Sequence, residues 1–97
     1  MGMPKGYWIG HVTVTNPDGY KEYVAANAEP LKKYGGRFLV RGGKYETRSG
    51  TERQRHVVIE FDSFEQAKAC YDSPEYQAAA KIRDANAVVD LVIVEGA

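Results

Sequence analysis

The stretch RHVVIEFDSFEQ, residues 55–66, decides the fold of this protein. Its first seven residues alternate between an apolar side and a mixed side, which predicts a β-strand over 55–61. Ser63 followed by Gln66 has the spacing of a capping box, so a helix is expected to begin directly after the strand. A strand that leads at once into a capped helix is half of a split βαβ arrangement.

The first part of the chain has the same organisation. The sequence HVTV of residues 11–14 recurs 45 residues later as HVVI of residues 56–59, and each copy precedes a helix start. Residues 7–15 are dense in β-branched and aromatic side chains and are predicted to form a strand. Asn16, Pro17 and Asp18 then supply a cap, a first-turn proline and an acidic first turn, which predicts a helix that lasts until Gly35-Gly36.

Three further elements complete the pattern. Residues 37–41 alternate and are predicted to pair, through a polar loop over 42–53, with the strand quoted above. The second helix is expected to break at Ser73-Pro74, restart, and end at about Asp84. The last strand is predicted over residues 88–94.

The element order β-α-β-β-α-β predicts an α+β, ferredoxin-like fold with a four-stranded antiparallel sheet and both helices on one face. The chain is expected to form a single domain over residues 1–97, with a core over about 7–96. The other face of the sheet is too apolar for water and too polar for a core, so we expect a second subunit to complete it. Strict alternation assigns to that face Tyr7, Ile9, His11, Arg37, Leu39, Arg41, His56, Val58 and Glu60.

Composition narrows the class of protein. Hydrophobic residues make up 43% and charged residues 27% of the 97 residues, which is typical of a globular domain. Thirteen basic residues balance thirteen acidic ones, so no nucleic-acid or membrane partner is expected. The N-terminus lacks the apolar core of a signal peptide, which indicates a cytoplasmic protein. The single Cys70 excludes an intrachain disulfide, and neither a metal nor a cofactor is expected.

The net charge of zero arises because segments of opposite charge cancel. Residues 1–31 carry a net charge of −1, residues 32–55 carry +6 and residues 56–97 carry −5. Complementary patches of this kind can orient two copies of one chain or attract an anion to the basic segment. A solvated basic loop is the alternative interpretation.

Several short motifs are spread over residues 7–96: Gly35-Gly36-Arg37, Arg41-Gly42-Gly43, Glu60-Phe61, the run from Tyr71 to Gln77, Arg83 and Val94-Glu95-Gly96. Together they make the chain resemble the bacterial family called domain of unknown function 1330. The resemblance implies a ferredoxin-like subunit that pairs into a dimeric α+β barrel, and it implies no established activity. Small cofactor-free monooxygenases, muconolactone isomerase-like enzymes and haem-degrading proteins share that architecture. One departure is Cys70, where the family commonly has Trp.

His11 and Glu60 are the candidate catalytic residues. They lie on strands that are neighbours in this topology, and alternation directs both toward the uncovered face. An imidazole and a carboxylate near one pocket can transfer a proton at neutral pH. The alternative is structural: His11 hydrogen-bonds across a dimer interface and Glu60 pairs with an arginine.

Arg37 and Arg41 are the candidate ligand-binding residues, and the hydroxyl of Tyr7 is a third. Two guanidinium groups on one strand suit a carboxylate or another planar anion. Equally, the two arginines can pair with Glu60 and Asp90 to neutralise charge. Structural roles are also expected for Arg83 in a helix-end salt bridge, for Cys70 as a buried thiol and for His56 as a solvated side chain.

The sequence therefore predicts a cytoplasmic homodimer with an intersubunit pocket. If the protein is an enzyme, it would act by proton transfer on, or cofactor-free oxygenation of, a small acidic or aromatic metabolite. The alternatives are a binding protein that holds a small anionic or aromatic ligand without turnover, and a purely structural dimer.

Overall fold

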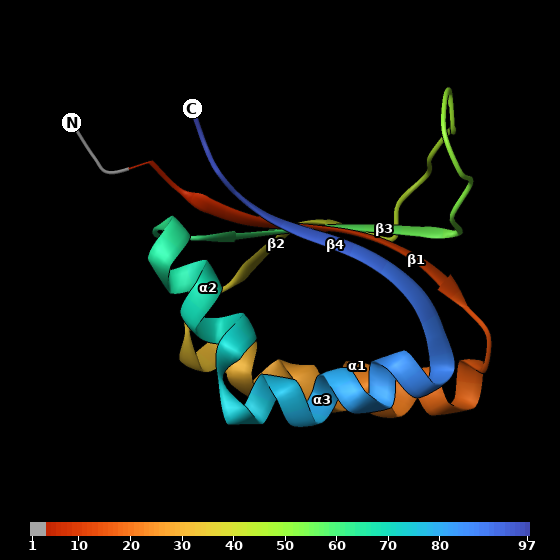
Figure 1. Cartoon of the computed structure of the whole chain (residues 1–97), viewed down its shortest axis with the longest axis horizontal. Helices are drawn as coiled ribbons and strands as arrows, with labels where there is room; N and C mark the ends of the chain where they lie inside the picture. Colours follow the sequence, from red (N-terminus) through yellow and green to blue (C-terminus); the bar gives the residue numbers. More distant parts are fainter. Residues whose placement is uncertain (1–3) are drawn as a thin grey trace.

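A computed structural model of the protein describes residues 4–97 and has two layers, a sheet and a layer of helices on one of its faces (Figure 1). The fold is α+β and ferredoxin-like, as predicted. The elements in chain order are β1 (Gly6–Val14), α1 (Pro17–Lys33), β2 (Arg37–Arg41), β3 (Arg55–Phe61), α2 (Phe64–Asp72), α3 (Pro74–Asn86) and β4 (Ala87–Glu95).

The four strands form one antiparallel sheet in the order β2-β3-β1-β4. The two central strands, β1 and β3, are the ones that carry the repeated HVTV and HVVI sequences. Their register places His11 directly opposite His56, so the repeat aligns the two copies side by side. β2 and β3 have the predicted bounds, and β1 and β4 each differ from the prediction by one residue at both ends.

Serine side chains start the second and third helices. The Oγ of Ser63 accepts a hydrogen bond of 3.0 Å from the backbone N–H of Gln66, as the capping-box spacing predicts. The Gln66 amide does not reach back to Ser63 but donates to the carbonyl of Tyr34 over 3.0 Å. Ser73 both accepts from the N–H of Tyr76 (3.2 Å) and donates to the carbonyl of Cys70 (2.7 Å), which joins α2 to α3 at the predicted break.

The core lies between the sheet and the helices and is centred on Trp8. This side chain is 2% exposed, and its indole N–H donates to the carbonyl of Ala67 over 2.9 Å. The rings of Phe61 and Tyr76 lie 5.1 and 4.7 Å from the Trp8 ring, in the tilted and edge-on arrangements that aromatic pairs prefer. Cys70 is fully buried nearby, and burial raises the pKa of its thiol to about 12, in agreement with the expected inert role.

A β-bulge in β2 overturns one sequence-based assignment. Phe38 pairs with Ile59, but the next pairs are Val40 with Val58 and Arg41 with Val57, so Leu39 is an extra residue. Strict alternation placed Arg41 beside Arg37 on the uncovered face. Because the bulge inserts one residue, Arg41 instead shares the helix-facing side with Phe38, and Val40 takes the predicted place.

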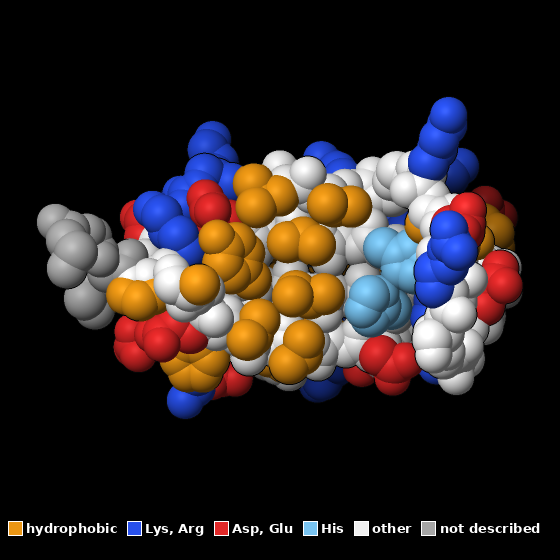
Figure 2. All heavy atoms as spheres, turned by 90° about the horizontal axis from the view of Figure 1, so that it is seen from above, with side chains coloured by type: hydrophobic (Ala, Val, Ile, Leu, Met, Phe, Trp, Pro, Cys, Tyr) orange, Lys and Arg blue, Asp and Glu red, His pale blue; other side chains and the backbone are white. Residues whose placement is uncertain are grey.

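The sheet face opposite the helices, called the open face below, is not covered by any element within residues 4–97. Figure 2 shows hydrophobic side chains gathered over its middle, with the histidines beside them and charged groups toward the ends. The loop that links β2 to β3 rises above this face, away from the helices (Figure 1). The large hydrophobic residues exposed on the open face or at the β2 edge are Leu39, Val40, Val88, Val92 and Val94.

Over residues 4–97, none of the helices has both the length and the apolar character that crossing a membrane requires.

Candidate functional site

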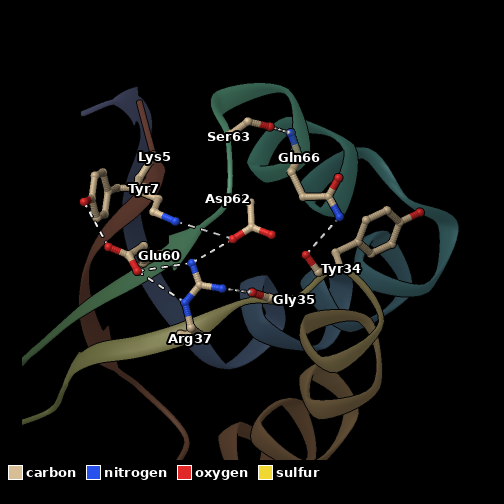
Figure 3. A network of polar contacts seen from close by, with 9 residues as sticks. All are labelled: Lys5, Tyr7, Tyr34, Gly35, Arg37, Glu60, Asp62, Ser63 and Gln66. Carbon is tan, nitrogen blue, oxygen red and sulfur yellow. Dashed lines mark hydrogen bonds and ion pairs between the residues drawn. The ribbon is translucent and has the colours of Figure 1, made fainter. Parts of the chain in front are cut away.

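At one end of the open face, Glu60 is the centre of a polar network (Figure 3). Tyr7 lies opposite Glu60 in the register of β1 and β3, and its hydroxyl donates to Oε2 over 3.1 Å. Arg37 donates from Nε and Nη2 to Oε1 of Glu60 over 3.2 and 3.1 Å, and from Nη2 to Asp62 over 3.2 Å. Lys5 extends the network to Asp62 at 3.6 Å.

These contacts leave Glu60 engaged on both oxygens. The hydrogen bond to Glu60 raises the pKa of Tyr7, because losing the phenolic proton would place two negative charges side by side. The same carboxylate raises the pKa of Arg37. The structure thus brings three predicted site residues together, in the arrangement that the structural interpretation describes.

The other end of the open face holds a histidine pair. The Nδ1 atoms of His11 and His56 lie 2.8 Å apart, so one ring donates to the other. The ring of Tyr45, from the loop after β2, lies 4.7 Å from the His56 ring. His56 is therefore half-buried, with an Nε2 atom that has no partner in the described part of the chain, and the expected solvated position is wrong.

His11 and Glu60 do not meet within one chain. His11 is aligned with His56, and Glu60 lies four residues further along β3, a separation of about 13 Å along the strand. Both side chains are on the open face, as predicted, but each is bonded to a different partner. Proton transfer by these two groups acting together would therefore need a second copy of the chain.

A cavity on the helix-facing side of the sheet was not foreseen from the sequence. It lies between the sheet and α1 and has a volume of about 40 Å³. Trp8, Phe38 and other apolar side chains line most of it, and Gly10 leaves space beneath β1. Arg41, which is exposed, also lines it, so the cavity reaches solvent on that side.

Three guanidinium groups line the cavity, and in one of them each nitrogen donates a hydrogen bond. Arg83 is 6% exposed and donates to Asp84 (2.9 Å), Tyr76 (3.0 Å) and Tyr71 (3.2 Å). The hydroxyls of Tyr76 and Tyr23 are 2.7 Å apart, which continues this network along the cavity wall. Burial raises the pKa of Tyr76, so its hydroxyl remains protonated. The expected salt bridge of Arg83 exists as one part of this larger network.

The other two guanidinium groups have no carboxylate partner. Across residues 4–97, the acidic side chains form their ion pairs with other cations and none with Arg41 or Arg55. The Nε of Arg55 is buried without a hydrogen-bond partner, and Arg41 packs over the ring of Phe38 at 4.2 Å.

The alternation of β3 indicates that Arg55 is on the buried side, but the prediction of site residues did not use this pattern. Arg55 has the same parity as Val57, Ile59 and Phe61, so alternation places it on the buried side of β3. A charged residue at the buried end of an otherwise apolar series is a candidate for function. Arg41 gave no such signal, because its side depends on a bulge that pattern analysis does not detect.

The lining determines what the cavity can do chemically. No histidine or carboxylate lines it, so it offers no ordinary general base, whereas its guanidinium groups suit a bound anion. The described residues also lack any cluster of three or more His, Cys, Asp or Glu side chains that could hold a metal ion.

Solved structures with this fold cover nearly the whole chain. A protein of unknown function from Rhodopseudomonas palustris superposes with a TM-score of 0.78 at 16% identity, over 97% of this chain and 83% of that one. SnoaB, a cofactor-independent oxygenase from Streptomyces nogalater, gives 0.65 at 14% identity, over 94% and 91%. A dimeric protein of unknown function with a ferredoxin-like fold, from Bacteroides fragilis, gives 0.57 at 16% identity, over 98% and 99%.

No curated protein matches the sequence. A family described as a domain of unknown function, DUF1330, matches residues 5–97. This match agrees with the resemblance inferred from the motifs around Arg37, Glu60 and Tyr71. The chain is a member of the DUF1330 family.

Proposed function

We propose that this protein is a homodimer that binds a small organic molecule in the cavity between the sheet and α1. The observation that carries the proposal is the cavity itself, which is apolar over most of its wall and cationic toward its mouth. Binding sites for small molecules typically combine an apolar lining with a few polar groups that orient the ligand. The absence of a general base from the lining favours binding over proton abstraction.

The open face supports pairing with a second copy of the chain. Val92 is 53% exposed there and Leu39, at the β2 edge, is 55% exposed, and an apolar sheet face of this kind is normally covered. A second copy can cover it through a two-fold contact, in which each subunit uses the same surface. The solved protein from Bacteroides fragilis, which shares the fold, is described as dimeric. The predicted intersubunit pocket, with His11 and Glu60 at its ends, stays a prediction.

A second candidate is cofactor-free enzyme activity on the bound molecule. The unpaired guanidinium groups favour it, because a fixed cation stabilises an oxyanion that develops during proton transfer or oxygenation. SnoaB, which shares the fold, is described as a cofactor-independent oxygenase. In this candidate the substrate must lose its proton to water or to a group outside the cavity, since the lining supplies no base.

Filling the cavity tests the proposal. A Cβ added to Gly10 would have one neighbour within 4 Å, the Cδ1 of Leu91 at 3.8 Å, so Gly10→Ala adds a methyl group without a clash and the larger Gly10→Val should fill more of the cavity. We expect these variants to remain folded and to lose the thermal stabilisation that small organic acids and amides give the wild type. The proposal is wrong if no such compound stabilises the wild type, or if Gly10→Val responds as the wild type does.

Oxygen uptake by the ligand-bound wild type, without any added cofactor, separates the two candidates. Uptake that is lost in Gly10→Val supports the enzyme, whereas binding with no uptake and no loss of ligand supports the binding protein.

A further inference from the structure

The strand position of Arg55 directs its side chain to the cavity, and a nearby glycine leaves space for it. Arg55 pairs with Val12 at the first position of β3 and faces the helices. A Cβ built on Gly42 would overlap Nη1 of Arg55, so a side chain at this position would displace the guanidinium from where it lies. Gly42 has φ = 69°, a conformation that glycine adopts without strain, and its N–H donates to the carbonyl of His56 over 2.9 Å. The turn after β2 thus accommodates the guanidinium of Arg55.

Arg41 lies close enough to act with Arg55. Arg41 pairs with Val57, two residues beyond Arg55, and diagonal neighbours on one face of an antiparallel pair are about 7 to 8 Å apart at Cα. Side chains of this length can therefore reach one small group between them. Tyr20 lines the same cavity; burial raises the pKa of its phenol, and the nearby Arg55 lowers it in part.

Arg41 and Arg55 differ from the arginines around them, because no neighbouring carboxylate within residues 4–97 balances their charge. Arg37 and Arg53, on the open side, each contact a carboxylate, and Arg83 contacts Asp84. Arg41 and Arg55 line a partly buried cavity that contains no Asp or Glu. A cation at such a site attracts an anion more strongly than one in bulk water does.

We infer that Arg55, together with Arg41, binds the carboxylate of a small organic acid, and that Gly42 serves this contact by leaving space for the guanidinium of Arg55. The inference rests on the proposed binding function and adds the chemical class of the ligand. The volume of about 40 Å³ corresponds to roughly three water molecules, which is the size of a carboxylate with one or two carbons attached. A larger acid would place its carboxylate in the cavity and extend past Arg41 into solvent.

Paired acids and amides of equal shape test the inference. Acetate, propionate and benzoate are titrated against acetamide, propionamide and benzamide, with binding followed by NMR chemical shifts. We expect the wild type to prefer the acid of each pair by about tenfold or more, as charge-assisted hydrogen bonds predict. Arg55→Gln should remove this preference, and Gly42→Ala should reduce it while keeping the charge.

Arg53→Gln is the matched control, because it removes the same charge only two residues from Arg55, and Arg53 already contacts Asp90 at 3.0 Å. It should keep the preference for acids. Equal binding of acids and amides by the wild type would overturn the inference while leaving the binding function intact. A preference that persists in Arg55→Gln would also overturn it. If no compound binds, the proposed function fails, and the inference fails with it.

Discussion

The two sides of the sheet differ in how they use their arginines. On the open side, Arg37 contacts Glu60 and Asp62, and Arg53 contacts Asp90. On the helix-facing side, Arg41 and Arg55 contact no carboxylate among the described residues, although Arg55 is half-buried. A paired arginine stabilises the chain that holds it, whereas an unpaired one at a cavity is available to a ligand. The chemistry of the guanidinium group is the same on both sides, so its partners decide its role.

The largest effect is expected from a charge placed on the open face. Val92→Lys leaves the single chain folded, because Val92 is exposed in it, but puts two ammonium groups into the proposed dimer contact. Juxtaposed like charges of this kind cost several kcal/mol, so the dimer should dissociate in light scattering after size exclusion. Ala25→Lys, on the exposed side of α1, adds the same charge and should leave the dimer intact. A Val92→Lys protein that stays dimeric would contradict pairing through this face.

The second prediction compares two arginines of the helix-facing side: Arg83, which has hydrogen-bond partners on each nitrogen, and Arg55, which has no carboxylate partner among the described residues. Arg83→Met removes hydrogen bonds to Tyr76, Tyr71 and Asp84 from a buried position, and should lower the free energy of unfolding by about 2 to 3 kcal/mol. Arg55→Met should change it by no more than about 0.5 kcal/mol. Urea denaturation measures both values. Equal losses would show that Arg55 is as structural as Arg83.

A third prediction concerns Cys70, which is fully buried in the core on the helix-facing side of the sheet. Its folded pKa of about 12 exceeds the model-compound value of 9.0, so the stability that its neutral thiol contributes is complete below pH 9 and is lost as the pH rises toward 12. The stability difference between the wild type and Cys70→Ala should therefore shrink over this range. Urea midpoints at several pH values check this. A difference that stays constant would mean that the thiol ionises as readily in the folded state as in the unfolded one.

The smallest effect is expected from Glu60→Gln. The substitution removes the charge that Arg37 faces, but these groups are partly exposed, so the melting temperature should fall only slightly and less so at high salt. Binding of carboxylates in the cavity should be unchanged, because Glu60 is on the other side of the sheet. Loss of a measured activity with the dimer intact would instead return Glu60 to the catalytic role predicted from the sequence.

The sequence predicted the fold well because the fold depends on local patterns. Alternation over residues 55–61 and the serine caps at Ser63 and Ser73 are short-range signals, and the structure has all of them. It also predicted that Arg37 and Glu60 share a face. Its structural alternative included the pairing of Glu60 with an arginine. It did not predict that His11 pairs with His56, because the positions of residues along neighbouring strands depend on register, which one sequence does not specify. The cavity was missed because it depends on the side of Arg41 and on the space beneath Gly10.

The extra residue in β2 has a consequence for association. β2 is an edge strand, with unpaired backbone groups that could extend the sheet into a neighbouring molecule. The bulge at Leu39 interrupts the regular spacing that such an extension needs. Deleting Leu39 would leave Val40 and Arg41 on their present sides, since the bulge already accounts for one residue, and would straighten the edge. The shortened chain should fold as before but become prone to fibre formation. The extra residue Leu39 would then be what protects the edge of the sheet from aggregation.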